Sequence, residues 1–156
     1  MRQRPQPVNK IGMTSNDRSA DGYQLSTQVG FNLRRANQRH VAIFARHVDG
    51  LTPTQFAALA RLYEYGALSQ NRLGRLTAMD SATIKGVVER LAAKDLVVSR
   101  ADANDLRLRV VELTATGRST FEMAEAQALQ ARAETLAPIS AEEAEMFEAI
   151  LAKLVD

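Results

Sequence analysis

The feature of this sequence that most constrains its fold is a pair of short helical segments separated by only a few residues. Residues 69–77 (SQNRLGRLT) and 81–95 (SATIKGVVERLAAKD) both carry apolar side chains at helical spacing. Ser69 is placed to cap the first helix, and either Asp80 or Ser81 to cap the second. Two helices joined by so tight a turn predict a helix-turn-helix unit.

Two strands are expected directly after the second of these helices. Residues 96–100 (LVVSR) are rich in β-branched side chains, and the turn-forming sequence ADAND follows them. From Leu106 to Leu113 (LRLRVVEL), apolar and polar side chains largely alternate. The pattern predicts a β-hairpin, and a hairpin in this place is the wing of a winged helix-turn-helix. The expected fold class is therefore mainly α with a small β-hairpin wing.

Helical segments flank this unit on both sides. Residues 23–48 predict an amphipathic helix with an arginine-rich face, which Asp-Gly ends, and Thr52 followed by proline begins a second helix. Thr114 caps a long helix that ends before Pro138. A capping box that starts at Ser140 predicts one more helix at the C-terminal end of the sequence.

The distribution of charge is more informative than the net charge of +2. Residues 1–50 carry eight Lys or Arg against three Asp or Glu, and residues 69–109 carry eight against five. Residues 110–156 carry three against nine. A basic first half with an acidic last segment is typical of a nucleic-acid binder whose final helices face elsewhere, and ordinary scatter of charge is the alternative.

Several classes of function find no support in the sequence. The absence of cysteine excludes disulfides, thiolate metal sites and cysteine nucleophiles. His40 and His47 lie on one helical face but lack further ligands, so no metal and no cofactor is expected, and no motif indicates an enzyme. No segment has the length and hydropathy of a signal peptide or membrane span, so we expect no membrane partner and a cytoplasmic location.

The central part of the sequence resembles the multiple antibiotic resistance regulator (MarR) family. Residues 79–117 read MDSATIKGVVERLAAKDLVVSRADANDLRLRVVELTATG. The family pattern has a recognition helix that opens with Asp and Thr and closes with Arg-Leu, a wing with Asp-x-Arg, and a strand that ends in Leu-Thr. The matching residues here are Asp80, Thr83, Arg90, Leu91, Asp105, Arg107, Leu113 and Thr114.

Two positions depart from the family pattern. Asp95 stands where the family often has glycine after the recognition helix, and Asp can also take the left-handed conformation that such a turn requires. Gly86 stands where many members have a larger polar residue. Close approach to DNA, close approach to a neighbouring helix, and simple tolerance are the alternatives for Gly86.

The resemblance implies a domain organisation and a function. Residues 1–21 are rich in polar residues, with two prolines and a glycine and without periodicity, and for that reason are expected to be a disordered tail. The rest, 22–156, is expected to be a single domain, with 51–113 binding DNA and 22–50 and 114–156 forming dimerisation helices. The expected function is a homodimeric, ligand-responsive repressor of an aromatic-compound catabolic or efflux operon. It would bind a palindromic operator in double-stranded DNA and be released by a small aromatic acid or its coenzyme A thioester. The alternative is an architectural DNA-binding protein without an effector.

The recognition helix and the wing carry the side chains expected to contact DNA. The exposed N-terminal end of the helix presents side chains to base edges and free backbone N–H groups to phosphate. In the wing, an arginine is expected to enter the minor groove, with an aspartate two residues earlier holding its guanidinium. The expected DNA contacts are Ser69, Gln70, Ser81, Ala82, Thr83, Lys85, Arg100, Asp105, Arg107 and Arg109.

These residues also have plainer explanations. Lys85 alone would be a solvated surface lysine, and Ser69 an ordinary N-cap. The charged side chains of an exposed hairpin often do no more than keep the protein soluble. The DNA-binding interpretation therefore depends on the motif as a whole.

The resemblance further implies an effector cavity between the dimerisation helices and the DNA-binding part. Arg39 and His40 would supply a cation or donor for a carboxylate, and Phe44, Phe56 and Tyr63 would supply aromatic walls. Arg39 together with the arginines at 34 and 35 would also suit the phosphates of an acyl-coenzyme A. The alternative is that the aromatic side chains belong to the core and the arginines are charges on the dimer surface.

Overall fold

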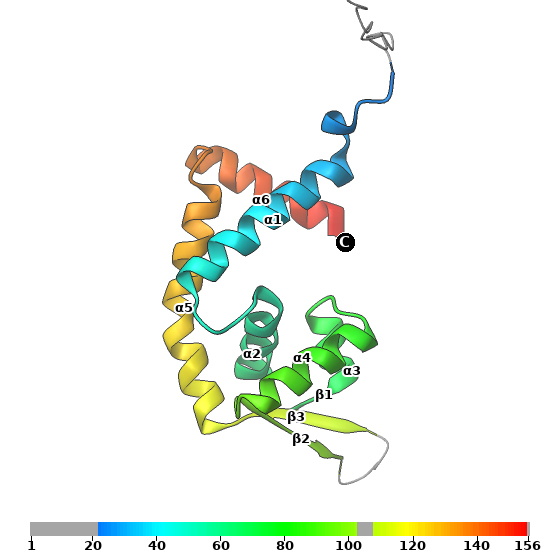
Figure 1. Ribbon diagram of the computed structural model, residues 1–156, viewed down its shortest axis with the longest axis vertical. Coiled ribbons are helices and arrows are strands. Elements are labelled where there is room, and N and C mark those ends of the chain that lie inside the picture. The colour runs from blue at the N-terminus through cyan, green and yellow to red at the C-terminus, as the bar shows by residue number, and fades with distance from the viewer. Residues whose placement is uncertain (1–21, 103–107, 156) are drawn as a thin grey trace, which may run out of the picture.

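The computed structural model describes residues 22–102 and 108–155, and α5 runs along one side of the molecule from the sheet to α6 (Figure 1). The helix-turn-helix elements and the sheet lie at one end, and α1 and α6 lie at the other, where they overlap in this view (Figure 1). A short 3₁₀ turn (Leu25–Thr27) precedes the helices. The helices are α1 (Val29–His47), α2 (Pro53–Tyr65), α3 (Gln70–Leu76), α4 (Ser81–Ala93), α5 (Ala115–Leu136) and α6 (Ala141–Val155).

The sheet has three antiparallel strands in the order β1-β3-β2. The predicted hairpin is β2 (Val97–Ala101) with β3 (Arg109–Leu113), paired so that Val97 faces Leu113. The prediction of a hairpin alone was incomplete, because β1 (Leu68–Ser69) adds a third strand on β3. Two residues are too few to show the alternation by which a strand is recognised.

The predicted caps set the helix boundaries. Thr52 and Gln55 form a reciprocal capping box at α2, and the Ser69 hydroxyl accepts from the backbone N–H of Arg72 at α3. Asp80, and not Ser81, caps α4. The first helix was predicted to begin at residue 23 and instead begins as a 3₁₀ turn, with α1 proper from residue 29.

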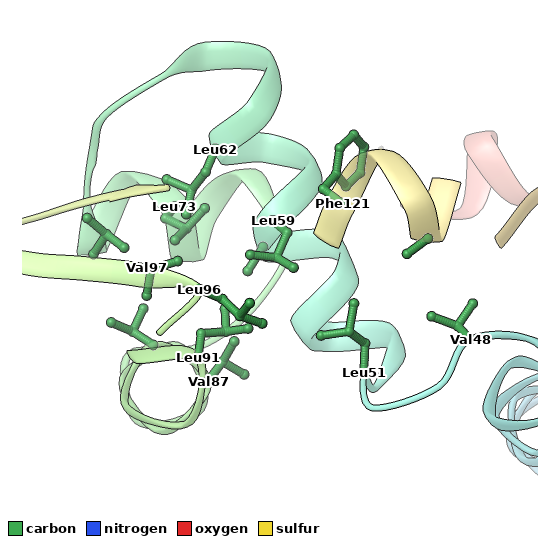
Figure 2. Packing of buried hydrophobic residues seen from close by; sticks show 14 of the residues in the cluster. Val48, Leu51, Leu59, Leu62, Leu73, Val87, Leu91, Leu96, Val97 and Phe121 are labelled. Carbon is green, nitrogen blue, oxygen red and sulfur yellow. The ribbon is translucent and has the colours of Figure 1, made fainter. Parts of the chain in front are cut away.

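The core joins α2, α3, α4 and the sheet to the long helix α5. Figure 2 shows Leu59, Leu73, Leu91 and Leu96 in one buried cluster, with Phe121 of α5 at its side. The predicted apolar stripe of α4 is buried throughout. Burial of these side chains is the main force that holds α2, α3, α4 and the sheet together.

Two turn residues and two glycines fix the geometry around α4. Asp95 has φ 56°, as predicted for the turn after the recognition helix, and Ala78 has φ 52° in the turn before it. A Cβ at Gly74 would lie 3.1 Å from Met79 O and 3.2 Å from Ile84 Cγ2, so this glycine lets α3 approach α4. The nearest atoms to a Cβ at Gly86 all belong to Arg90, so no neighbouring helix requires that glycine.

The start of α5 packs against the backbone at the end of the turn after α4. A Cβ at Gly117 would lie 1.8 Å from Leu96 O, which is not possible without moving the backbone. The backbone N–H of Thr114 donates to the same carbonyl oxygen at 3.1 Å, and the Thr114 hydroxyl donates to Asp95 O at 2.6 Å. This junction fixes where α5 leaves the sheet.

We expect Gly117→Ala to destabilise the fold by about 3 kcal/mol or more, because the added methyl group overlaps a backbone carbonyl that cannot rotate away. Urea denaturation measures the change. Gly30→Ala is the matched control, since nothing lies within 4 Å of a Cβ there and the free energy of unfolding should stay equal or rise slightly. Equal stability of the two variants would contradict the close contact.

Candidate nucleic-acid interface and adjoining cavity

The exposed end of α4 carries four of the ten predicted DNA contacts. Because Ile84 and the other apolar residues of α4 face the core, Ser81, Ala82 and Thr83 are left exposed at its N-terminal end. The Lys85 side chain is 68% exposed, and its Nζ lies a long 3.9 Å from the Glu89 carboxylate. Such a pair in water contributes little, so this lysine is available to a phosphate or a base.

One of the backbone N–H groups at the N-terminal end of α4, which were expected to be free, is already hydrogen-bonded. The Asp80 carboxylate accepts the N–H of Thr83 at 2.7 Å, so that donor is already used. This hydrogen bond lowers the pKa of Asp80 below its usual value. The carboxylate of Asp80 therefore lies at the N-terminus of α4, and the backbone N–H of Thr83 is not free to bind a phosphate.

A groove between α4 and the sheet brings together three of the predicted contacts. Gln70, Lys85 and Arg109 line it, with a volume of about 570 Å³. Arg109 also donates a hydrogen bond to Ser99 O at 3.4 Å across the hairpin. Ser69 lies at the start of α3 and serves as its N-cap.

Of the remaining wing residues, Arg100 is paired with a carboxylate inside the hairpin. Arg100 forms a two-pronged ion pair with Glu112, with Nη2 3.0 Å from Oε2 and Nη1 bonded to Oε1. Its charge is therefore partly neutralised within the hairpin. Asp105 and Arg107 lie outside the described residues, and their contact with DNA stays a prediction.

A second feature is a cavity of about 500 Å³ between α1, the end of α5 and α6. Of the five residues predicted to hold an effector, Arg39 and His40 line it. Arg39 donates to the carbonyl oxygens of Thr135 (2.7 Å) and Glu134 (3.3 Å), which lie in the last turn of α5. Its guanidinium thus caps α5 as well as facing the cavity. The apolar walls include Leu33, Ala36, Leu136, Ile139, Phe147 and Leu151.

The three aromatic residues predicted as walls lie elsewhere. Phe44 is 4% exposed and belongs to the core. A row of rings runs from it through Phe56 (centroids 5.7 Å apart) and Phe121 (5.3 Å) to Tyr63 (4.7 Å). The structure therefore does not bring these rings to the cavity with Arg39 and His40. Phe44 belongs to the core and Phe56 packs against it, whereas Tyr63, at the end of the row, is 37% exposed.

Charged and polar groups around that row tie α2 and α1 to α5. The Tyr63 hydroxyl donates to Glu122 at 3.0 Å, and this bond and the negative charge of Glu122 raise the pKa of Tyr63. On α1, Arg46 and His47 both bind Glu134, with His47 Nε2 2.6 Å from Oε2. The hydrogen bond from His47 is the main reason that the pKa of Glu134 is lowered.

His47 binds Glu134, and His40 Nδ1 lies 3.0 Å from Thr135 Oγ1, so both histidines of α1 contact α5. Within residues 22–102 and 108–155, no group of three or more His, Asp or Glu side chains is arranged to hold a metal ion. Among the same residues, no helix has the length and apolar character needed to cross a membrane.

The cavity residues on α5 and α6 could not be identified from the sequence. Thr135, which contacts both Arg39 and His40, lies about 95 positions away along the chain. The capping box at Ser140 did predict that the chain turns here. No local pattern, however, pairs α1 with the end of α5.

The fold and the exposed helix define a winged helix-turn-helix DNA-binding protein. Residues 51–108 match the sequence model of the MarR family. The HTH-type transcriptional repressor NicR of Pseudomonas putida is 38% identical over 136 residues, which are 86% of either chain. The chain belongs to the MarR family and is a transcriptional regulator, not an enzyme.

Two solved structures extend the similarity to the fold of the whole described chain. A probable transcriptional regulator from Pseudomonas aeruginosa is 51% identical, with a TM-score of 0.80 over 84% of this chain and 99% of that one. BpsR of Bordetella bronchiseptica is 39% identical, with a TM-score of 0.81 over 86% and 98%. The DNA binding of BpsR is regulated by 6-hydroxynicotinic acid.

We expect Lys85→Ala to weaken DNA binding and to lower the slope of log affinity against log salt by about one, because the substitution removes one phosphate partner. Fluorescence anisotropy at several salt concentrations measures both quantities. Lys153→Ala removes the same charge on α6, outside the elements predicted to meet DNA, and should change neither quantity as long as sedimentation shows an unchanged oligomeric state. A Lys85 variant that matches the Lys153 variant would show that this face of α4 does not meet DNA.

Proposed function

We propose that the protein is a repressor that binds a palindromic operator as a homodimer and is released by a small aromatic carboxylic acid. The observation that carries the proposal is the apolar cavity with Arg39 and His40 on its wall. Two relatives support it, since NicR is a repressor and BpsR is regulated by 6-hydroxynicotinic acid. The proposed DNA contacts remain those of α3, α4 and the wing.

The shape of the cavity favours the free acid over its coenzyme A thioester. About 500 Å³ with mostly apolar walls suits a single ring, and a few polar groups at one side suit a carboxylate. Arg34 and Arg35, which would have met the phosphates of coenzyme A, do not line the cavity. They lie over the Phe31 ring at 5.5 and 5.7 Å.

Exposed apolar side chains on the terminal helices support the homodimer. On α6, Met146 is 65% exposed, Ile150 48% and Leu154 64%, and Val29 of α1 is 67% exposed. A monomer rarely leaves such a surface uncovered, and a second copy can cover it by two-fold symmetry. Two recognition helices must then lie about 34 Å apart to meet successive major grooves.

We expect sedimentation equilibrium at micromolar concentration to show a dimer, and Ile150→Lys to shift the protein toward monomer. A lysine at a buried interface position leaves a charge without a partner, which costs several kcal/mol. Val98→Lys, at an exposed apolar site on β2, is the control and should remain dimeric. A stable monomer of the unchanged protein would overturn the proposed assembly.

The cavity is connected to the helix-turn-helix through α5, so a ligand bound there is able to affect DNA binding. Its walls come from α1, α5 and α6, and α5 continues to the sheet beside α4 (Figure 1). A ligand releases DNA only if it binds more tightly to the arrangement in which the recognition helices are wrongly spaced. A tenfold loss of operator affinity requires about 1.4 kcal/mol of such preference.

We expect an aromatic acid to bind more weakly in the presence of saturating operator DNA, by the same factor by which the acid weakens DNA binding, because coupling is reciprocal. Calorimetric titrations with and without DNA measure this factor. Ala36→Leu, which fills the cavity from α1, should abolish ligand binding and keep DNA binding. Ala45→Leu, on an exposed part of α1 that does not line the cavity, should retain both.

The calorimetric titrations also distinguish a ligand-responsive repressor from an architectural DNA-binding protein. Equal ligand affinity with and without operator, or no ligand binding at all, would favour the architectural DNA-binding protein. Ligand binding that survives Ala36→Leu would move the site away from the α1–α5–α6 cavity. Arg39→Ala and His40→Ala then test the two polar groups separately, with a thermal denaturation control because Arg39 also caps α5.

A further inference from the structure

The outer face of the recognition helix α4 has no side chain at position 86. Ala82 and Gly86 are four residues apart and therefore lie on the same face of the helix. The buried residues Ile84, Val88 and Leu91 lie on the opposite face, toward the core. A glycine within a helix lowers its stability relative to alanine, and no neighbouring helix requires one here. Only the outer face of α4 is left to account for this glycine.

The guanidinium of Arg90 occupies the space that a side chain at position 86 would fill. A Cβ at Gly86 would lie 3.2 Å from Nη1 of Arg90, 3.5 Å from Nη2 and 3.7 Å from Cζ. This direction agrees with helix geometry, because the Cα–Cβ bond tilts toward the N-terminus and brings a side chain over the residue four positions earlier. Gly86 is half-buried although it lies on the outer face, so the arginine covers it.

The charge of this guanidinium is not neutralised within the part of the chain that the structure describes. The Arg90 side chain is exposed and forms no ion pair with any carboxylate of residues 22–102 and 108–155. Arg100, by contrast, is held by Glu112. Glu89, the carboxylate next to Arg90 in sequence, lies 3.9 Å from Lys85 instead. The donors of the Arg90 fork are therefore available to acceptors outside the protein.

We propose that Arg90 is a base-reading residue, directed by the absence of a side chain at Gly86, and that it binds O6 and N7 of one guanine in each half-site. The planar fork of an arginine matches these two acceptors in the major groove. The small residues Ala82 and Gly86 let the helix backbone come close to the base edges. Because the guanidinium already lies along the helix, binding costs less side-chain freedom.

This inference rests on the proposed function, in which α4 enters the major groove. It adds a residue that is absent from the expected set of DNA contacts, and it names the base that this residue reads. It also decides among the alternatives for Gly86, since the glycine makes room for the arginine and for the approach of DNA.

Selection from random DNA tests the assignment. The full-length protein selects binding sequences from a library of random duplexes about 20 base pairs long, which is enough for two half-sites one helical turn apart. Fluorescence anisotropy then measures the affinity for the selected duplex and for duplexes in which each G·C pair of a half-site is replaced in turn. Arg90→Met should bind the selected duplex about tenfold more weakly. The variant should also become insensitive to the replacement of one particular G·C pair and keep its response to the others.

Two results would overturn the assignment. If Arg90→Met weakens binding to all duplexes equally and lowers the slope of log affinity against log salt by about one, the guanidinium binds a phosphate and not a base. If the variant keeps both the affinity and every base preference, Arg90 does not contact DNA. Arg132→Met, which removes an exposed arginine of α5, is the matched control. It should change no base preference, with sedimentation showing the same oligomeric state for all variants.

Gly86→Ala tests the positioning step while Arg90 is still present. The added methyl group would lie 3.2 Å from Nη1, so the fork must move from its present place. Discrimination at the same G·C pair should fall about threefold, the effect of a side chain forced away from its preferred rotamer. Thermal stability should rise at the same time, because alanine favours a helix.

Undiminished discrimination in Gly86→Ala would show that the glycine does not direct Arg90. Failure of the unchanged protein to select any sequence would instead count against the proposed function. The failure of the inference and the failure of the proposed function are therefore distinguishable.

Discussion

The backbone contact between Leu96 and the first turn of α5 is the constraint on which the rest of the molecule depends. Leu96 ends the turn after α4, and its carbonyl oxygen both accepts the N–H of Thr114 and lies against Gly117. The exit of the recognition helix and the start of α5 are thereby held at one point. Because α5 then extends to Thr135 and the cavity, a small rotation at this point is magnified along a helix of 22 residues.

The parts of the fold that were predicted correctly depend on neighbours in sequence. The caps at Thr52, Ser69 and Thr114 need only side chains that reach three residues ahead. The left-handed turn at Asp95 is likewise a local property of a short polar side chain. Such features can be deduced without knowing what packs against them.

The candidate site was predicted less completely, because its contacts join distant segments. Arg39 and His40 were correctly singled out as able to line a cavity, but their partner Thr135 could not be found from spacing. Phe56 and Tyr63 were assigned to the same cavity from the family resemblance, and the structure instead packs both against Phe121. Helical periodicity identifies which face of a helix is buried, but it does not tell whether that face packs in the core or lines the cavity.

The two left-handed residues around α4 have a consequence for how regulators of this kind diverge. Ala78 and Asp95 bracket the helix, and a left-handed residue other than glycine costs about 1–2 kcal/mol, so the surrounding packing must hold each bend in place. The entry and exit of the recognition helix are therefore set by the scaffold and not by its exposed side chains. If Ser81, Ala82 and Lys85 contact DNA as proposed, substitutions within little more than one helical turn change the target sequence without moving the helix.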